Sequence, residues 1–221
     1  MCGRFVQVTS AADLEFSFHT RNPLPNTRPR FNASPGQELL VVRRNPETGE
    51  RSLDLLVWGL VPHWSKDRKI GWRCINARAE TVDTLPAFRS AFRKRRCLVP
   101  AEAFYEWRKE GSRKQPYALA MKSREMFGLA GLWENWKDPE TSEWLRTFTI
   151  ITTEPNELAA QFHDRMPAII GPDDYERWLT PDTEVKDLLR PYPAELMTAW
   201  PVSLRVNSPA VDEPDLLEAA E

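Results

Sequence analysis

The chain has 221 residues, of which 41% are hydrophobic and 28% charged, a composition ordinary for a globular protein with a sizeable core. Its apolar runs, such as residues 54–61, fall far short of the roughly 18 to 20 residues that a membrane-spanning helix needs. The net charge is -2 and the start of the chain shows no signal-peptide pattern, so we expect a cytoplasmic protein without a membrane partner.

The elements expected in chain order are mostly short strands, beginning with residues 4–8. Ser10 is a helix cap in front of residues 11–18, and turn-forming residues join two strands at 38–44 and 51–58 into a hairpin. Further strands are predicted over 103–107, 117–122, 126–133, 147–153 and 200–206, and short helices over 155–162 and 172–179. With 19 prolines and no internal repeat, the pattern favours a strand-rich mixed fold.

The last residues, 208–221, are acidic and contain two prolines, which predicts a loosely held tail. We therefore divide the chain into one domain over residues 1–206 and an acidic C-terminal tail over 207–221.

Charge is unevenly distributed along the chain. Residues 1–124 hold 23 Lys and Arg against 12 Asp and Glu, whereas residues 125–221 hold 7 against 20. One interpretation is a basic face that attracts phosphates on a nearly neutral molecule. The other is mutual neutralisation of the two parts by ion pairs.

Cys2 is the most unusual residue of the sequence. If Met1 is removed, Cys2 carries a free amine beside its thiol, and both groups are partly nucleophilic near neutral pH. Together they can condense with an aldehyde and close a thiazolidine ring, which a thiol alone cannot do. The alternative is a small packing residue.

The other cysteines, Cys74 and Cys97, form no C-x-x-C pair with Cys2 or with each other, so we expect reduced thiols. His19 and His63 show no recognised ligand spacing with these cysteines. We expect neither a metal nor a cofactor.

Residues 103–107 place a carboxylate among aromatic side chains. In an extended segment Glu106 shares a face with Phe104, whereas Tyr105 and Trp107 point the other way. Burial would raise the pKa of Glu106 toward neutrality, which suits a donor and acceptor of protons. The alternative is a solvent-facing residue of an edge strand.

Residues 73–80, if extended, place Cys74, Asn76 and Arg78 on one face. Asn76 could orient the N-terminal residue by hydrogen bonds, and Arg78 could hold a phosphate. The alternative is a surface strand with a polar outer face.

His163 is the histidine best suited to proton transfer, with Arg165 two residues later, although a lone histidine is more often structural. Trp64 lies in a predicted loop beside basic residues, which suits stacking on the bases of single-stranded nucleic acid; core packing is the alternative. Residues 89–96 are either a phosphate-contacting surface or a solvated helix face. No Gly-rich phosphate loop and no G-x-S-x-G motif occurs.

Seven segments occur in an order that resembles one known family. They are MCGRF, RFNASPG, WGLVPHW, INARAET, CLVPAEAFYEW, ITTEPN and HDRMPAII. The chain closely resembles the SRAP family, the SOS-response-associated peptidase-like proteins that shield abasic sites in DNA. The resemblance implies a compact α+β domain around a curved, barrel-like antiparallel β-sheet with short flanking helices.

The resemblance also implies an activity. After loss of Met1, removed by the protein itself, Cys2 would attack the aldehyde of a ring-opened abasic site and form a thiazolidine crosslink, with lyase activity and reversal as further steps. The partner implied is single-stranded DNA or a strand junction. We expect a monomer that associates with the nucleoid when bound to DNA.

Residue by residue, the family's glutamate falls on Glu106 as proton shuttle, its asparagine on Asn76 to position Cys2, and its histidine on His163 to assist proton transfer and later reversal or strand cleavage. Its DNA contacts fall on Arg4, Arg78, Thr152 and Arg165, with Trp64 as a wedge against the bases. Ala103 stands in place of the usual glycine and Ser34 in place of alanine, so the entrance to the site is expected to differ slightly.

Two other classes stay open. In a cysteine peptidase or amidohydrolase, Cys2 would attack an acyl carbon with His163 as base. In a DNA-binding module without chemistry, the arginines and Trp64 would hold the strand and Cys2 would be dispensable.

Overall fold

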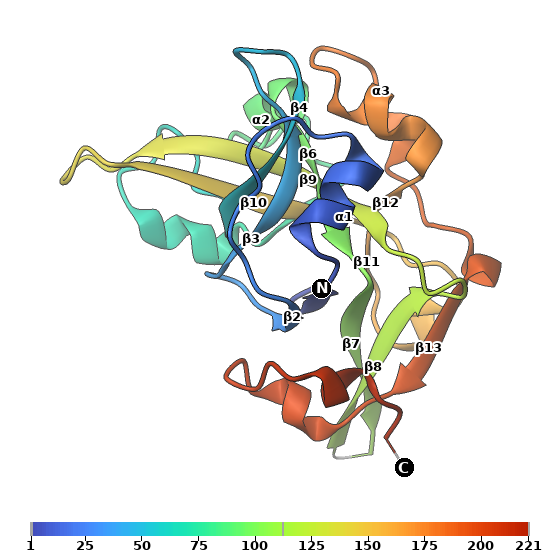
Figure 1. Ribbon diagram of the computed structural model, residues 1–221. Coiled ribbons are helices and arrows are strands. Elements are labelled where there is room, and N and C mark those ends of the chain that lie inside the picture. Colours follow the sequence, from blue (N-terminus) through green and yellow to red (C-terminus); the bar gives the residue numbers. More distant parts are fainter. Residues whose placement is uncertain (1, 112, 221) are drawn as a thin grey trace.

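Five strands close into a barrel in the computed structural model of the protein, which describes residues 2–111 and 113–220 (Figure 1). The barrel strands are β3 (Glu38–Arg44), β4 (Arg51–Trp58), β6 (Arg96–Ala101), β9 (Phe127–Lys137) and β10 (Trp144–Thr153). Each pairs with two others, in the cyclic order β10, β4, β3, β6, β9 and back to β10. Closure removes the unpaired sheet edges that would otherwise invite aggregation.

The ring is antiparallel except at one junction. β4 and β10 run parallel, with Val57 opposite Thr147 and Trp58 opposite Phe148. The expected α+β fold around a barrel-like sheet is therefore confirmed, and the parallel pair is the detail that differs from an all-antiparallel sheet.

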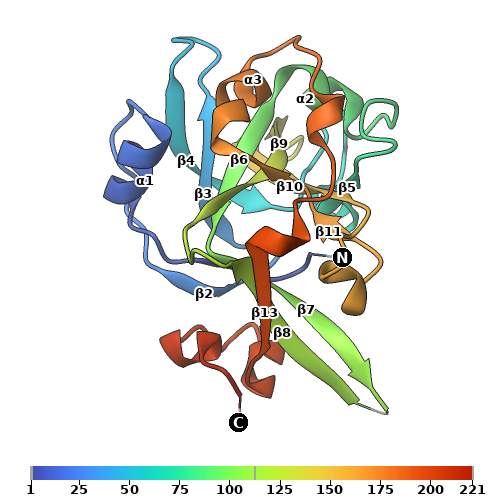
Figure 2. The ribbon, with the colours of Figure 1, turned by 90° about the vertical axis from the view of Figure 1, so that its right-hand side faces the viewer.

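A second sheet lies beneath the barrel, in the order β13, β8, β7, β1, β2 (Figure 2). Its strands are β1 (Phe5–Gln7), β2 (Arg30–Ala33), β7 (Ala103–Glu110), β8 (Arg113–Met121) and β13 (Met197–Pro201). Three short strands complete the barrel side: β5 (Asn76–Arg78) and β11 (Met166–Pro167) on β10, and β12 (Ile169–Ile170) on β9. Phe104 on β7 packs into one core cluster with Cys2, and Tyr105 into another on the opposite face, as strand alternation predicts.

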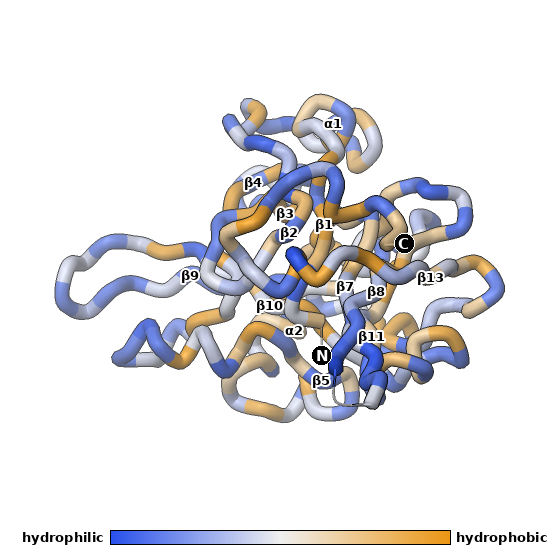
Figure 3. The backbone as a smooth tube through the Cα atoms, turned by 90° about the horizontal axis from the view of Figure 1, so that it is seen from below, coloured by the Kyte–Doolittle hydropathy of each residue, from blue (hydrophilic) through white to orange (hydrophobic). Residues whose placement is uncertain are grey.

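Helices are few and short. They are α1 (Ala11–Phe18), α2 (Arg89–Lys94) and α3 (Tyr175–Leu179), with 3₁₀ segments η1 (Arg68–Arg73), η2 (Ala159–Gln161), η3 (Pro172–Asp174), η4 (Lys186–Leu188), η5 (Ala194–Leu196), η6 (Leu204–Asn207) and η7 (Pro214–Leu217). Within the described ranges, none of these helices is long and apolar enough to cross a membrane. Figure 3 shows the apolar β1 near the centre, while the far end of the β9–β10 hairpin projects outward.

Most predicted elements are confirmed, including the helix that begins after Ser10, whose Oγ accepts a hydrogen bond from the Asp13 N–H at 3.2 Å. The helix predicted over 155–162 is wrong, because only the turn η2 forms there. The Asn156 amide fixes this segment instead: its Oδ1 accepts from the Ala159 N–H at 2.8 Å, and its Nδ2 donates to the Tyr192 carbonyl at 2.6 Å.

The prediction of a loosely held tail is also wrong for residues 208–220. The Asp212 Oδ1 accepts hydrogen bonds from the backbone N–H groups of Phe31 at 2.6 Å and Asn32 at 2.9 Å. Leu216 is fully buried. The acidic segment thus covers β2, as the red segment at the bottom of Figure 1 shows.

The structure confirms mutual neutralisation of the two parts in part, whereas a basic face that attracts phosphates stays a prediction. Glu176 pairs with Arg44 and Arg51, and Glu134 pairs with Arg95, so acidic residues of the second part do neutralise basic residues of the first. In contrast, among the ion pairs of the described residues none involves Lys66, Arg68, Lys69 or Arg78.

Candidate active site

Cys2 lies in the core, next to the start of β1. It is fully buried in a cluster that includes Phe104, Ile150 and Met166. The segment is fixed by pairing of Phe5 with β2 and β7, and by a hydrogen bond from the Tyr105 N–H to the Arg4 carbonyl at 3.0 Å. The N-terminal end of the described chain is therefore held where the two sheets meet.

Glu106 is buried beside Cys2, with only 3% of its surface exposed, and lies opposite Tyr117 of β8. Burial raises the pKa of Glu106 to about 7, near which a carboxyl group both gives and takes protons. Burial and the nearby Glu106 carboxylate in turn raise the pKa of the Cys2 thiol, so this thiol is protonated at neutral pH.

Asn76 reaches the same region from β5. The strand runs parallel to β10 with Asn76 opposite Ile150, a member of the Cys2 cluster, and Nδ2 donates to the Ile150 carbonyl at 3.4 Å. Its Oδ1 is buried and has no hydrogen-bond partner among the residues described. Asn76 thus offers an acceptor inside the site.

Cys74 does not share this face, contrary to the prediction for residues 73–80. Its backbone, with φ -117° and ψ 30°, ends η1 rather than extending β5. The alternation therefore starts only at Asn76, and Cys74 packs with Ala77 in a different cluster.

His163 follows η2 and is partly buried, with 34% of its side chain exposed. Its Nδ1 accepts from the Arg165 N–H at 3.0 Å and lies 2.7 Å from Asp164 Oδ1. The contact with the Arg165 N–H requires an Nδ1 without a proton, whereas the contact with Asp164 requires a proton on Nδ1. The two contacts therefore favour different protonation states of the imidazole. Burial lowers the pKa of His163, which favours the neutral ring.

Two predicted DNA contacts, Thr152 and Arg165, lie together, and Arg78 is beside them. Arg78 is exposed and stands opposite Thr152 in the β5–β10 pair. Arg165 donates to the Thr152 carbonyl at 2.6 Å and forms a two-pronged pair with the Glu80 carboxylate at 2.7 and 2.9 Å. This pair lowers the pKa of Glu80, so the carboxylate is charged at neutral pH.

The remaining predicted contacts lie at different depths. Arg4 is half-buried, and burial lowers the pKa of its guanidinium. Trp64 is 52% exposed, in agreement with a loop position, and its Nε1 donates to the Pro86 carbonyl at 3.4 Å. The loop that carries Trp64 is held on the barrel by Thr147, which accepts from the Val61 N–H at 2.9 Å.

Three residues near the candidate site were not predicted from the sequence: Phe162, Tyr117 and Glu80. The Phe162 ring lies 4.7 Å from that of Tyr117, which brings the His163 segment against β8 and Glu106. Glu80 is the third, as the partner of Arg165. The aromatic residue before His163 and the acidic residue two positions after Arg78 were the available signals.

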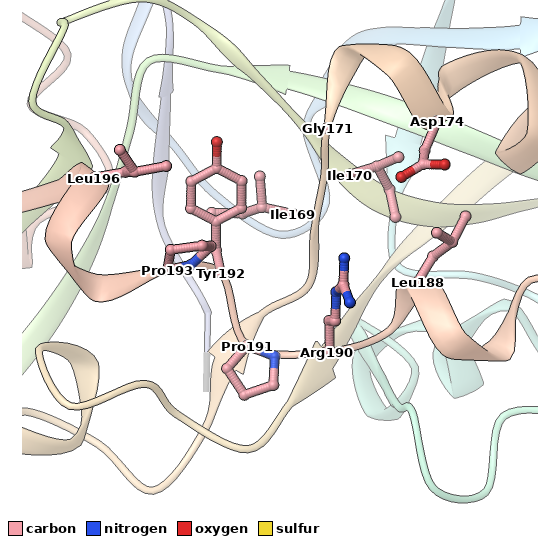
Figure 4. A pocket seen from close by; sticks show the side chains of 10 residues that line it. All are labelled: Ile169, Ile170, Gly171, Asp174, Leu188, Arg190, Pro191, Tyr192, Pro193 and Leu196. Carbon is pink, nitrogen blue, oxygen red and sulfur yellow. The ribbon is translucent and has the colours of Figure 1, made fainter.

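A separate pocket lies away from this cluster. Its volume is about 510 Å³, and Figure 4 shows the Arg190 side chain extending into it between Tyr192 and Leu188. None of the predicted site residues lines it. Nor do the described residues hold any group of three His, Cys, Asp or Glu side chains arranged to bind a metal ion.

Comparison with known proteins matches most of the chain to one family. The family model described as SOS response associated peptidase (SRAP) matches residues 1–209. The chain is 41% identical over 226 residues to "Abasic site processing protein YoqW" of Bacillus subtilis (strain 168), covering 99% of this chain and 100% of that protein. It is 33% identical to "Abasic site processing protein HMCES" of Gallus gallus, covering 88% of this chain and 67% of that protein.

The fold recurs in solved structures. A crystal structure of a protein from Bacteroides thetaiotaomicron superimposes with a TM-score of 0.90 at 27% sequence identity, over 100% of both chains. The barrel with its second sheet and short helices is thus shared with that protein.

Proposed function

The chain belongs to the SOS response associated peptidase family, and from that premise we propose that it processes abasic sites in DNA by covalent capture at Cys2. The observation that carries the proposal is the burial of Cys2 beside Glu106, a carboxyl group whose pKa is about 7. Relatives that carry the name of abasic site processing proteins support the same substrate.

The chemistry begins with hydrolysis of the bond between Met1 and Cys2, which releases methionine and frees the Cys2 amine; Met1 itself lies outside the described residues. The amine adds to the C1′ aldehyde of the ring-opened sugar and water leaves, giving a protonated imine. The sulfur then adds to C1′ as the thiol loses its proton, and a thiazolidine results. One aldehyde and one aminothiol thus yield the ring and one water.

Glu106 serves both proton transfers. Protonated, it assists departure of the hydroxyl group as water; ionised, it takes the proton from the Cys2 thiol. The raised pKa of that thiol makes such a base necessary, because little thiolate exists before the transfer. Asn76 orients the amine, and His163 assists proton transfer, reversal of the adduct and the strand cleavage of a lyase.

DNA is held by its backbone beside the site. Arg4, Arg78 and Arg165 contact phosphates with Thr152, and Trp64 wedges against the bases. Three neutralised phosphates predict that the logarithm of affinity for a single strand falls with the logarithm of salt concentration with a slope of about -2. The protein acts as a monomer on single strands or strand junctions, in the cytoplasm and at the nucleoid.

The experiment is intact mass spectrometry of the purified chain before and after exposure to an oligonucleotide with one abasic site. The expected results are a starting mass without Met1 and a product with the oligonucleotide attached less one water. Cys2→Ser, an acetylated N-terminus and an undamaged strand are the controls, and none should give a stable adduct. Retention of Met1 in reactive protein, or an adduct with Cys2→Ala, would overturn the proposal.

The same experiment separates the proposal from a cysteine peptidase or amidohydrolase. A peptidase needs a thiolate, and burial together with Glu106 raises the pKa of Cys2 instead. Such an enzyme would keep its activity after acetylation of the amine, whereas thiazolidine formation would stop.

A further inference from the structure

A second pocket, of about 630 Å³, opens between η1, the turn 35–37 and the end of β4. Its floor is formed by three apolar side chains of the lining that are almost fully buried: Val57, Trp58 and Val61. Trp72 forms an exposed wall, with 65% of its surface accessible. An aromatic face of this size left in water beside an apolar floor is typical of a binding site rather than of a core residue.

Two close backbone approaches occur around Trp72, one at Gly36 and one at Gly71. Gly36 has φ +86°, and a Cβ there would come within 2.9 Å of the Trp72 ring. A Cβ on Gly71, next to Trp72 in the chain, would lie 2.7 Å from the Gly59 carbonyl oxygen. Glycine at these positions lets η1 and the Trp72 ring lie directly against the backbone of the turn 35–37 and of Gly59.

The rim of the pocket is basic. Arg68 and Lys69 line it, and Arg73 is exposed beside Trp72. Among the ion pairs of residues 2–111 and 113–220, none involves these three cations. The acidic residue of the lining, Asp67, is engaged in the cap of η1, where it accepts from the Lys69 N–H at 2.8 Å. An aromatic wall with cations around it matches the base and phosphate of a nucleotide.

The pocket adjoins the Cys2 site through a shared side chain. The Trp58 ring at its floor lies 5.1 Å from that of Phe5, and the Trp58 Nε1 donates to the Ile75 carbonyl at 2.9 Å. Phe5 follows Arg4 and Ile75 precedes Asn76. Trp58 therefore lies between the pocket and the segments that carry Arg4 and Asn76, so the pocket is next to the candidate site.

We propose that this pocket holds one unstacked nucleobase of the damaged strand, stacked on Trp72, with Arg68 and Lys69 near its phosphate. The inference rests on the proposed function, since it assumes that DNA lies along the Cys2 site. It adds a requirement for an intact base at a fixed position beside the lesion, and it explains a preference for single strands, because a paired base could not enter.

The test measures equilibrium binding, which needs no covalent step. Labelled single strands carry a central tetrahydrofuran residue, which mimics the lesion but has no aldehyde. In a series of strands a second tetrahydrofuran replaces each flanking nucleotide in turn, which removes one base and keeps its phosphate. Fluorescence anisotropy gives the affinity of the unaltered protein, of Trp72→Ala and of Trp144→Ala, a matched control because Trp144 is 66% exposed at the start of β10.

Trp72→Ala should weaken binding about 5- to 150-fold, since a stacked base contributes roughly 1 to 3 kcal/mol. At one flanking position, loss of the base should weaken binding to the unaltered protein by the same factor that Trp72→Ala does. The Trp72→Ala variant should bind the strand with and without that base equally well. Trp144→Ala should bind as the unaltered protein does, and Trp72→Phe should retain most of the affinity.

Equal affinity of Trp72→Ala and the unaltered protein would overturn the inference. So would a loss in Trp72→Ala that is the same for every strand, because the pocket would then recognise no base. These outcomes are independent of the mass-spectrometric test. If no adduct forms there, capture at Cys2 is contradicted, but the effect of Trp72 on base binding can still be observed.

Discussion

At the scale of single residues, Glu106 has a proposed role in proton transfer and an energetically unfavourable buried position. A carboxylate with 3% exposure is more stable protonated, and this is what raises its pKa to about 7. The burial that would suit Glu106 to the proposed proton transfer therefore reduces the stability of the fold at alkaline pH.

Replacing Glu106 with Gln should stabilise the protein increasingly as the pH rises. The folded state keeps the proton up to pH 7, whereas the unfolded chain releases it near its ordinary pKa of about 4.3, so stability falls between these values. Urea unfolding at pH 5 and pH 8 should show the advantage of Glu106→Gln growing by roughly 2 to 3 kcal/mol. The exposed Glu110→Gln on the same strand is the control, and an advantage that does not change with pH would contradict the assignment.

Glu80 is expected to limit DNA affinity through its pair with Arg165. Glu80→Gln removes a negative charge beside the proposed phosphate contacts and releases the guanidinium, so binding of a single strand at low salt should tighten several-fold, with a smaller gain at high salt. Asp83→Asn, which breaks the pair with Lys186 nearby, is the control for altered net charge. Weaker binding of Glu80→Gln would mean that Glu80 instead positions Arg165.

At the scale of elements, the candidate site is assembled from several separate segments rather than from one strand. The segment before β1 contributes Cys2, β5 contributes Asn76, β7 contributes Glu106, and the segment after η2 contributes His163. The contact of Phe162 with Tyr117 is what holds that last segment against β8.

Phe162→Ala should therefore slow adduct formation, by about 10- to 100-fold, because misplacing a catalytic group by an ångström costs on that order. The free energy of unfolding should change little, whereas the rate of adduct formation falls, since Phe162 is only partly buried. Single-turnover rates measured beside Phe16→Ala, whose ring is 81% exposed on α1, provide the comparison. An unchanged rate would show that η2 is held without this contact.

Sequence patterns correctly predicted those strands and helices that are determined by neighbouring residues in the chain. Alternation identified β7 and the faces of Glu106 and Tyr105, and a serine cap identified α1. The errors arose where distant contacts decide, as with Asn156 bonded to Tyr192 and Asp212 bonded to Phe31.

The roles assigned to the candidate site residues stay predictions, and the arrangement of these residues could not be predicted from the sequence. The motif around Asn76 and Arg78 indicated polar residues with a role, whereas the parallel pairing of β5 with β10, which sets Arg78 opposite Thr152, leaves no local pattern. The pairing of Arg165 with Glu80 is hidden for the same reason, because 85 positions separate the two in sequence.

At the scale of the whole molecule, the C-terminal segment is part of the fold. Asp212→Ala should cost about 2 to 3 kcal/mol of unfolding free energy, since two backbone N–H groups of β2 lose a charged acceptor. Asp215→Ala, which breaks a pair with Arg205 at the surface, should cost less than about 1 kcal/mol. Urea unfolding compares the two, and equal losses would mean that the segment is not anchored through Asp212.

The pairing of β1 also determines when the N-terminal segment can fold during translation. Phe5 is enclosed by Ala33 and by Phe104, so the second neighbour emerges from the ribosome about a hundred residues after the first strand. Until then the amino end of the nascent polypeptide is open to a host aminopeptidase. Once β7 has docked, Cys2 lies in the core. Under the proposed function, any methionine still attached to Cys2 would then have to be removed by the folded protein itself.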